Sequence, residues 1–230
     1  MRGLFTYIET GVLAGALALV LYLTAARAVT AGTARAGIAL GGVALGWFVI
    51  LWELARLGAF EGGSGGWRVL VALTALAPAV IGAVRPQWLA VRLVSPGGGA
   101  TVEALILAQV CRVVSGALLI ALAGEALPAW AAVPPAAADL LVAGSAPALG
   151  RLVRRGDPRA SGWVMAWSAG GIAAAAYLVS VVLLMGRTAT YFLTLYPLVL
   201  IPVFVTPVVV ALQCAAVAAV RQRTPGVPSA

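Results

Sequence analysis

Three polar residues lie far inside long apolar stretches of this sequence, Gln109, Arg112 and Asp139. The stretch around Asp139 follows the stretch around Arg112 directly, across a tight break at residues 124–128. If both stretches are helices that cross a membrane, each charge lies about ten residues, or about 15 Å, from its end. A lone charge at that depth costs about 2.5–3.5 kcal/mol on insertion scales. The sequence therefore predicts that Arg112 and Asp139 pair.

Gln109 precedes Arg112 by three residues and faces the same way on a helix, so it is expected to complete the hydrogen bonding of the pair. Two interpretations of this polar centre remain open. It binds or relays a ligand, or it is a structural clamp between neighbouring helices. Buried ion pairs fix the register of helices more reliably than they add stability.

Two consecutive prolines, Pro134 and Pro135, precede Asp139 by five and four residues. Proline removes a backbone donor and disrupts a helix interior. Broken helices at the depth of the bilayer centre are one way in which transporters build their sites. We therefore expect a helix break at Pro134 and Pro135, close to the polar centre.

The usual sets of catalytic residues are missing. The sequence has no histidine, and all 15 of its positive charges are arginines. These facts remove histidine-based metal and haem sites and a lysine Schiff base. The run from Gly62 to Gly66 matches G-x-S-x-G around Ser64, but no histidine is present to activate the serine. We predict no enzyme, no metal site, a flexible glycine loop, and buried free thiols at Cys111 and Cys214.

The composition predicts the fold class. Hydrophobic residues make up 63% of the chain and charged residues only 10%, whereas soluble domains carry about 25% charged residues. We expect an all-α, polytopic transmembrane helical bundle of about seven spans, each long enough for a hydrocarbon core of about 30 Å. The predicted spans are residues 10–28, 37–58, 67–84, 102–123, 129–150, 162–186 and 191–220.

The arginines predict the orientation of the bundle, because cytoplasmic loops carry an excess of positive residues. With seven spans, ten arginines fall on the side of the C-terminus and four on the side of the N-terminus, with Arg112 uncounted. The ten are Arg27, Arg35, Arg85, Arg92, Arg151, Arg154, Arg155, Arg159, Arg221 and Arg223, and the four are Arg2, Arg56, Arg68 and Arg187. We expect an outside N-terminus and a cytoplasmic C-terminus.

Four regions divide the chain. Residues 1–84 form an N-terminal half of three spans, residues 85–100 a Pro/Gly-rich interfacial connector, residues 101–220 a C-terminal half of four spans, and residues 221–230 a cytoplasmic tail. The abundance of Ala, Gly and Arg is typical of a GC-rich bacterial genome. Together these features place the protein in the bacterial cytoplasmic (inner) membrane as a multi-pass protein.

A set of residues in the second half of the chain resembles one group of proteins. The set comprises Gln109, Arg112, the stretch from Leu127 to Ala131, Asp139, Ala146-Pro147 and the stretch from Tyr196 to Pro202. It resembles uncharacterised bacterial polytopic membrane proteins that carry an LPxxFAxPAGxGD-like stretch. The chain departs from that group because Pro134-Pro135 and three alanines replace a glycine-containing version, and Gln213 stands where a histidine is usual. The resemblance implies a multi-span topology and no particular activity.

Two functions fit these observations. The first is a non-enzymatic integral membrane protein whose polar centre binds, or moves, a small or anionic ligand. The second is an accessory or structural subunit of a larger respiratory or photosynthetic membrane complex, in which small residues pack against other membrane subunits or pigments. The lipid bilayer is the expected partner in both cases. The basic net charge of +8 fits arginine-rich loops beside anionic lipid, and we expect no nucleic acid partner.

Overall fold

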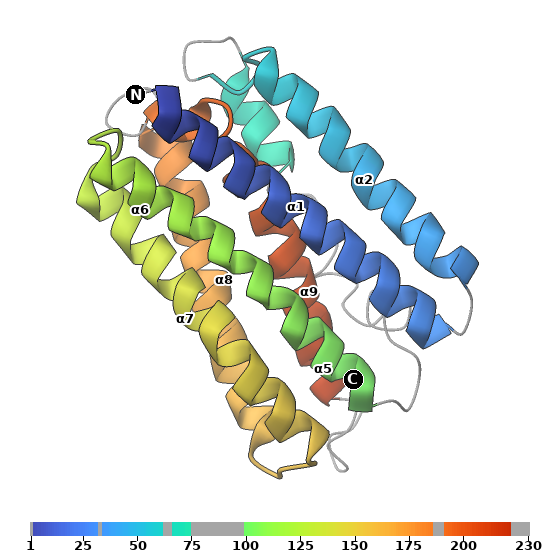
Figure 1. The fold of residues 1–230 in the computed structure, drawn as a ribbon. Coiled ribbons are helices and arrows are strands. Elements are labelled where there is room, and N and C mark those ends of the chain that lie inside the picture. The colour runs from blue at the N-terminus through green and yellow to red at the C-terminus, as the bar shows by residue number, and fades with distance from the viewer. Residues whose placement is uncertain (1, 32–33, 62–65, 75–98, 186–190, 222–230) are drawn as a thin grey trace.

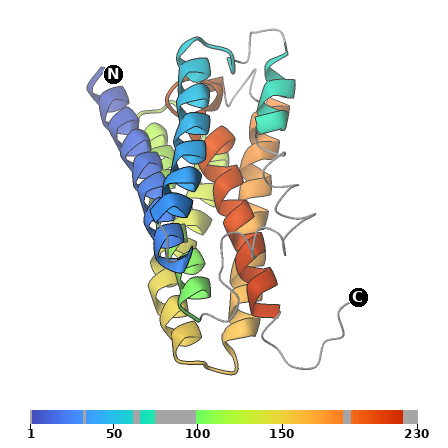
Figure 2. The same cartoon turned by 90° about the vertical axis from the view of Figure 1, so that its right-hand side faces the viewer.

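The structure is a computed structural model that describes residues 2–31, 34–61, 66–74, 99–185 and 191–221. Within these ranges every regular element is helical, and the helices run alternately up and down a single bundle (Figures 1 and 2). In a helix the backbone N–H and C=O groups bond to one another. Long apolar runs form helices because they have no polar side chains that could bond these groups instead. The predicted all-helical class is confirmed.

The described residues form a series of helical elements along the chain. The N-terminal pair consists of α1 (Arg2–Ala31) and α2 (Ala34–Arg56), and residues 67–74 form a further helical stretch. The remaining elements are α5 (Gly99–Leu107), η1 (Ala108–Ser115), α6 (Gly116–Ala123), α7 (Ala129–Arg154), α8 (Ala160–Met185), η2 (Tyr191–Thr194), η3 (Ile201–Val205) and α9 (Thr206–Arg221).

Among the described residues, four helical segments are long and apolar enough to cross a membrane, Val102–Ala123, Ala129–Arg154, Ala160–Met185 and Ile201–Arg221. They correspond to the predicted fourth to seventh spans. The first of them is a continuous rod that joins α5, η1 and α6 (Figure 1). Helices α1 and α2 cover the predicted first and second spans, and α1 contains a shorter apolar stretch, Ile8–Tyr22.

The predicted start of the last span is wrong. The continuous helix begins at Ile201 and not at Tyr191, because residues 191–194 form a short 3-10 turn and residues 195–199 form turns. Pro197 has no N–H to donate and disfavours a helical conformation at the residue before it, and here the chain turns instead of continuing as a helix. Pro202 is tolerated because it lies near the start of η3, where the missing donor is not needed.

Several predicted features lie outside the described residues. They are residues 62–65 of the glycine loop, residues 75–84 of the third span, residues 85–98 of the connector, and the tail from residue 222. The described part of the third predicted span, residues 67–74, is helical.

A tight turn joins α6 to α7, as the break at residues 124–128 predicts. The N–H of Glu125 donates to the carbonyl of Leu122 and the N–H of Ala126 to that of Ala121, both at 2.9 Å. This is the capping pattern that often ends helices with a left-handed residue. Here that residue is Glu125, with a φ of 57°, and the turn sets α7 antiparallel to the central rod.

The core extends through the whole bundle. Its largest cluster joins buried side chains from most of the described elements, among them Val12 on α1, Leu51 on α2, Leu118 on α6, Leu178 on α8 and Phe204 on η3. The rings of Phe48 and Phe204 lie 5.0 Å apart. Helix α2 therefore packs on the bundle through α1 and η3.

A chain of polar contacts ties α1 and α2 to the segment before η3. The indole N–H of Trp52 donates to the Tyr196 hydroxyl at 3.0 Å, and this hydroxyl donates to the carboxylate of Glu9. Burial, and then the hydrogen bond to Glu9, raise the pKa of Tyr196. Its hydroxyl thus stays a donor at neutral pH.

Candidate functional site

The polar centre is built on a change of helix type. Gln109, Arg112 and Ser115 all lie on η1, a 3-10 helix in the middle of the first candidate span. A 3-10 helix has about three residues per turn, so side chains three positions apart stack on one face. All three residues are buried, whereas Val110 and Val113 between them are exposed. The 3-10 turn thus directs a line of polar side chains into the bundle.

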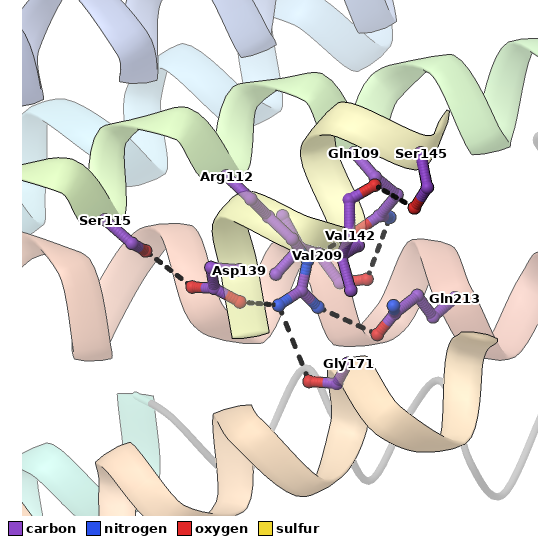
Figure 3. A network of polar contacts seen from close by, with 9 residues as sticks. All are labelled: Gln109, Arg112, Ser115, Asp139, Val142, Ser145, Gly171, Val209 and Gln213. Carbon is purple, nitrogen blue, oxygen red and sulfur yellow. Dashed lines mark hydrogen bonds and ion pairs between the residues drawn. The ribbon is translucent and has the colours of Figure 1, made fainter. Parts of the chain in front are cut away.

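Arg112 and Asp139 are in direct contact (Figure 3). Arg112 Nη1 donates to Asp139 Oδ1, and the Ser115 hydroxyl donates to the other carboxylate oxygen, Oδ2. The depth argument from the sequence therefore brought together the correct pair. Because both carboxylate oxygens have partners and the two charges cancel, the pair is electrically neutral as a unit.

Gln109 orients the guanidinium from the same helix. Arg112 Nε donates to Gln109 Oε1 at 2.8 Å, and Gln109 Nε2 donates to the Val209 carbonyl of α9 at 3.1 Å. The amide thus bridges two helices as well as binding the arginine. Its predicted place in the centre agrees with the structure.

Helices α8 and α9 close the opposite side of the guanidinium. Arg112 Nη2 donates to Gln213 Oε1 at 2.8 Å, and Nη1 makes a longer contact of 3.5 Å with the Gly171 carbonyl (Figure 3). A Cβ on Gly171 would stand 2.2 Å from Gln213 Nε2. Only glycine at position 171 leaves room for this amide.

Two buried polar atoms next to this network have no hydrogen-bond partner among the described residues. They are Gln213 Nε2 and Ser168 Oγ, on side chains that are 0% and 2% exposed. Buried polar groups are almost always paired with protein or with an ordered water, so each unpaired one requires an explanation. The Gln213 amide of α9 lies against Gly171 of α8, and Ser168 precedes Gly171 by three residues on the same helix.

Sequence reasoning missed part of the site. Ser115, Ser168 and Gly171 were not identified, and Gln213 drew attention only as a departure from a resemblance. The spacing could have identified Ser115. Gln109 precedes Arg112 by three residues and Ser115 follows Arg112 by three, so the three residues form a regular series. For Gln213 the signal was an uncharged polar residue in the middle of the last apolar run.

The predicted helix break at Pro134 and Pro135 is wrong. Helix α7 is continuous from Ala129 to Arg154, with both prolines inside it. They are its sixth and seventh residues, where each removes one donor to a carbonyl of the first turn. The Tyr177 hydroxyl of α8 donates to the carbonyl of Trp130 at 2.7 Å and so replaces the bond that Pro134 removes.

The described part of the chain has no cluster of metal ligands and no disulfide. No group of three or more His, Cys, Asp and Glu residues there is arranged to hold a metal. Cys111 and Cys214 are free thiols, as the sequence predicts, but both residues are half-buried and not fully buried. The polar centre consists of one ion pair and the hydrogen bonds around it.

The chain belongs to a family described as Domain of unknown function (DUF8737), whose model matches residues 69–221. That range contains the whole polar centre, from Gln109 to Gln213, and leaves α1 and α2 outside it. No curated protein and no solved structure matches the chain.

Proposed function

We propose that the protein is a non-enzymatic, multi-pass integral membrane protein of the bacterial cytoplasmic (inner) membrane, and that its polar centre binds a small polar ligand. Four apolar segments of sufficient length support the membrane location. The last turn of α7, the loop between α7 and α8, and the end of α9 supply Arg151, Arg154, Arg155, Arg159 and Arg221 at one end of the bundle. Such clustering favours that end as the cytoplasmic one.

The observation that carries ligand binding is the pair of unpartnered polar atoms, Gln213 Nε2 and Ser168 Oγ. Gln213 Nε2 lies 2.2 Å from the position of a Cβ on Gly171. Ser168 is three residues earlier on α8, and side chains at that spacing start about 5–6 Å apart. We infer that one ligand atom bridges the two groups through hydrogen bonds, as an ordered water would.

Charge balance narrows the class of ligand. Asp139 already neutralises Arg112, so an anion would have to displace this carboxylate from a buried guanidinium. A neutral ligand avoids that cost. The Gln213 amide donates hydrogen bonds, and the Ser168 hydroxyl both donates and accepts them. The site therefore suits a small neutral molecule with a hydrogen-bond acceptor, of which water is the smallest.

Substitution of Ser168 tests this proposal through the sign of its effect on stability. An unpartnered buried hydroxyl is unfavourable, so its removal in Ser168→Ala should leave stability unchanged or raise it if no ligand binds. If a ligand is bound, Ser168→Ala should destabilise by about 0.5–1.5 kcal/mol, the net value of a hydrogen bond.

The measurement is reversible unfolding of the purified protein in detergent. The matched control is Ser180→Ala, because Ser180 is exposed on the same helix and should give a change close to zero. A stability of Ser168→Ala that is unchanged, or higher than that of the wild type, would contradict ligand binding at this place.

A second function, that of an accessory subunit in a membrane complex, has its own supporting observation. Gly42 and Gly46 lie exposed on α2, and a Cβ on either would meet nothing within 4 Å among the described residues. Small residues four positions apart permit close approach of another helix. Purification in mild detergent separates the two functions, since a subunit should bring stoichiometric partners with it and a ligand-binding protein should not.

A further inference from the structure

A second site lies at the turn between α6 and α7, away from the polar centre. It is an open pocket of about 680 Å³. Its walls are formed by Leu122, Glu125, Ala126, Leu127, Pro128, Ala129, Tyr191 and Phe192. The candidate spans on either side of the turn end at Ala123 and begin at Ala129. The pocket therefore lies at the end of the apolar segments, where a bilayer would place its head groups.

One part of the pocket attracts positive charge. Glu125 supplies a carboxylate, and it follows directly on the C-terminal end of α6, which carries the partial negative charge of a helix end. Tyr191 and Phe192 add two aromatic rings with centroids 6.4 Å apart. The faces of aromatic rings attract ammonium groups.

A second part of the pocket, at the start of α7, attracts negative charge. Pro128 and Ala129 line it, and α7 begins at Ala129. The N–H groups of Ala131 and Ala132 donate to the Pro128 carbonyl. Those of Ala129 and Trp130, at the very start of α7, have no carbonyl of their own helix to bond and bear a partial positive charge. The pocket thus presents the two signs of charge side by side, with the apolar side chains of Leu122 and Leu127 next to them.

We propose that this pocket binds the head group of a zwitterionic phospholipid that ends in a primary ammonium. The ammonium lies at Glu125 and the two rings, the phosphate at the start of α7, and the acyl chains follow the exposed side chains of Ile120 and Val133. This inference depends on the proposed membrane location, because a lipid is available only to a protein in the bilayer.

The backbone of Glu125 gives an independent reason to expect a role for its side chain. Glu125 has a φ of 57°, in the left-handed region that glycine adopts without strain. Glycine would therefore suit this position better than glutamate for stability alone. The variant Glu125→Gly should raise the melting temperature of the protein and at the same time reduce lipid binding.

Native mass spectrometry of the detergent-purified protein tests the proposal. The probes are phosphatidylethanolamine and phosphatidylglycerol with identical acyl chains, of which only the first carries an ammonium. Wild type should retain phosphatidylethanolamine preferentially. Glu125→Gln should lower that preference about threefold to fivefold, the effect expected from an exposed charge interaction of up to about 1 kcal/mol. The control Glu53→Gln removes another exposed carboxylate, one that pairs with Arg56, and should keep the preference.

Equal retention of the two lipids by wild type, or an unchanged preference in Glu125→Gln, would overturn the assignment. Displacement of the lipid by an equal concentration of glycerophosphoethanolamine would also overturn it, because the occupant would then be a soluble ammonium compound. Carbonate extraction of cell membranes separates this failure from that of the proposed function. Protein that stays in the membrane but shows no lipid preference contradicts the pocket only, whereas extracted protein contradicts both.

Discussion

A single guanidinium joins four parts of the bundle. Arg112 is 1% exposed and carries five N–H donors. Its acceptors lie on η1, α7, α8 and α9, and they are Gln109, Asp139, Gly171 and Gln213. Water cannot reach this arginine, so its charge is stabilised only by these partners. The loss of one charge should thus cost more than the loss of both.

Substitution of the pair tests this at the scale of residues. Asp139→Asn leaves Arg112 charged and uncompensated, and should lower the free energy of unfolding by about 3–5 kcal/mol. The double variant Arg112→Met, Asp139→Asn removes both charges and should recover much of that loss. Unfolding of the three proteins in detergent measures these changes. A double variant less stable than Asp139→Asn would contradict the description of a mutually compensating pair.

The sequence predicted the ion pair but not the full set of its partners. The depth of a residue in a span follows from its distance along the sequence to the end of that span. Arg112 and Asp139 could therefore be matched by counting residues in two adjacent spans. Gln213 lies 101 positions from Arg112 along the chain, and no local spacing connects the two. Ser168 and Gly171 depend on how closely α8 approaches α9, which only the folded packing determines.

At the scale of elements, the helices deviate from the regular pattern near the centre without breaking. The central rod tightens into a 3-10 helix at η1, and the last span begins with the π-helical turn η3. The prolines of α7 led us to predict a break, because each leaves a backbone carbonyl without its helical donor. The sequence does not show which side chain will donate to that carbonyl instead. Tyr177, 47 positions from Trp130, does so.

A double-mutant cycle tests the role of Tyr177. Tyr177→Phe should destabilise the wild type by about 0.6 kcal/mol, and by no more than about 1.7 kcal/mol, the range found for hydrogen bonds between membrane helices. In the Pro134→Ala background the cost should be smaller, because residue 134 then has an N–H for the Trp130 carbonyl. Unfolding in detergent gives both values. An equal cost in both backgrounds would show that Tyr177 does not compensate for the proline.

At the scale of the whole molecule, charge is distributed unequally between the two ends of the bundle. The end formed by the α7–α8 loop and the end of α9 carries five arginines, Arg151, Arg154, Arg155, Arg159 and Arg221, and two acidic residues, Asp157 and Glu103. The other end carries Glu9, Glu53, Glu61 and Glu125, together with Arg56 and Arg68. In a membrane this distribution favours the first end as the cytoplasmic one.

Reporter fusions test the predicted orientation. A reporter active only in the cytoplasm should be active when it is fused after Ala230. The same reporter should be active when it is inserted at Gly156, an exposed left-handed residue in the α7–α8 loop. Both positions are on the arginine-rich side by the span count. Activity at one position and not at the other would contradict the number of spans between them, and inactivity at both would reverse the orientation.

We propose above all that a membrane-embedded polar centre holds a small ligand beside a neutral ion pair. The most direct measurement is an experimental density map of the wild-type protein in a lipid nanodisc, at a resolution that shows ordered waters. We expect Arg112 and Asp139 in contact, and a separate density within hydrogen-bond distance of both Gln213 Nε2 and Ser168 Oγ. A map in which these two atoms bond to each other or to the backbone, with no density between them, would contradict the claim.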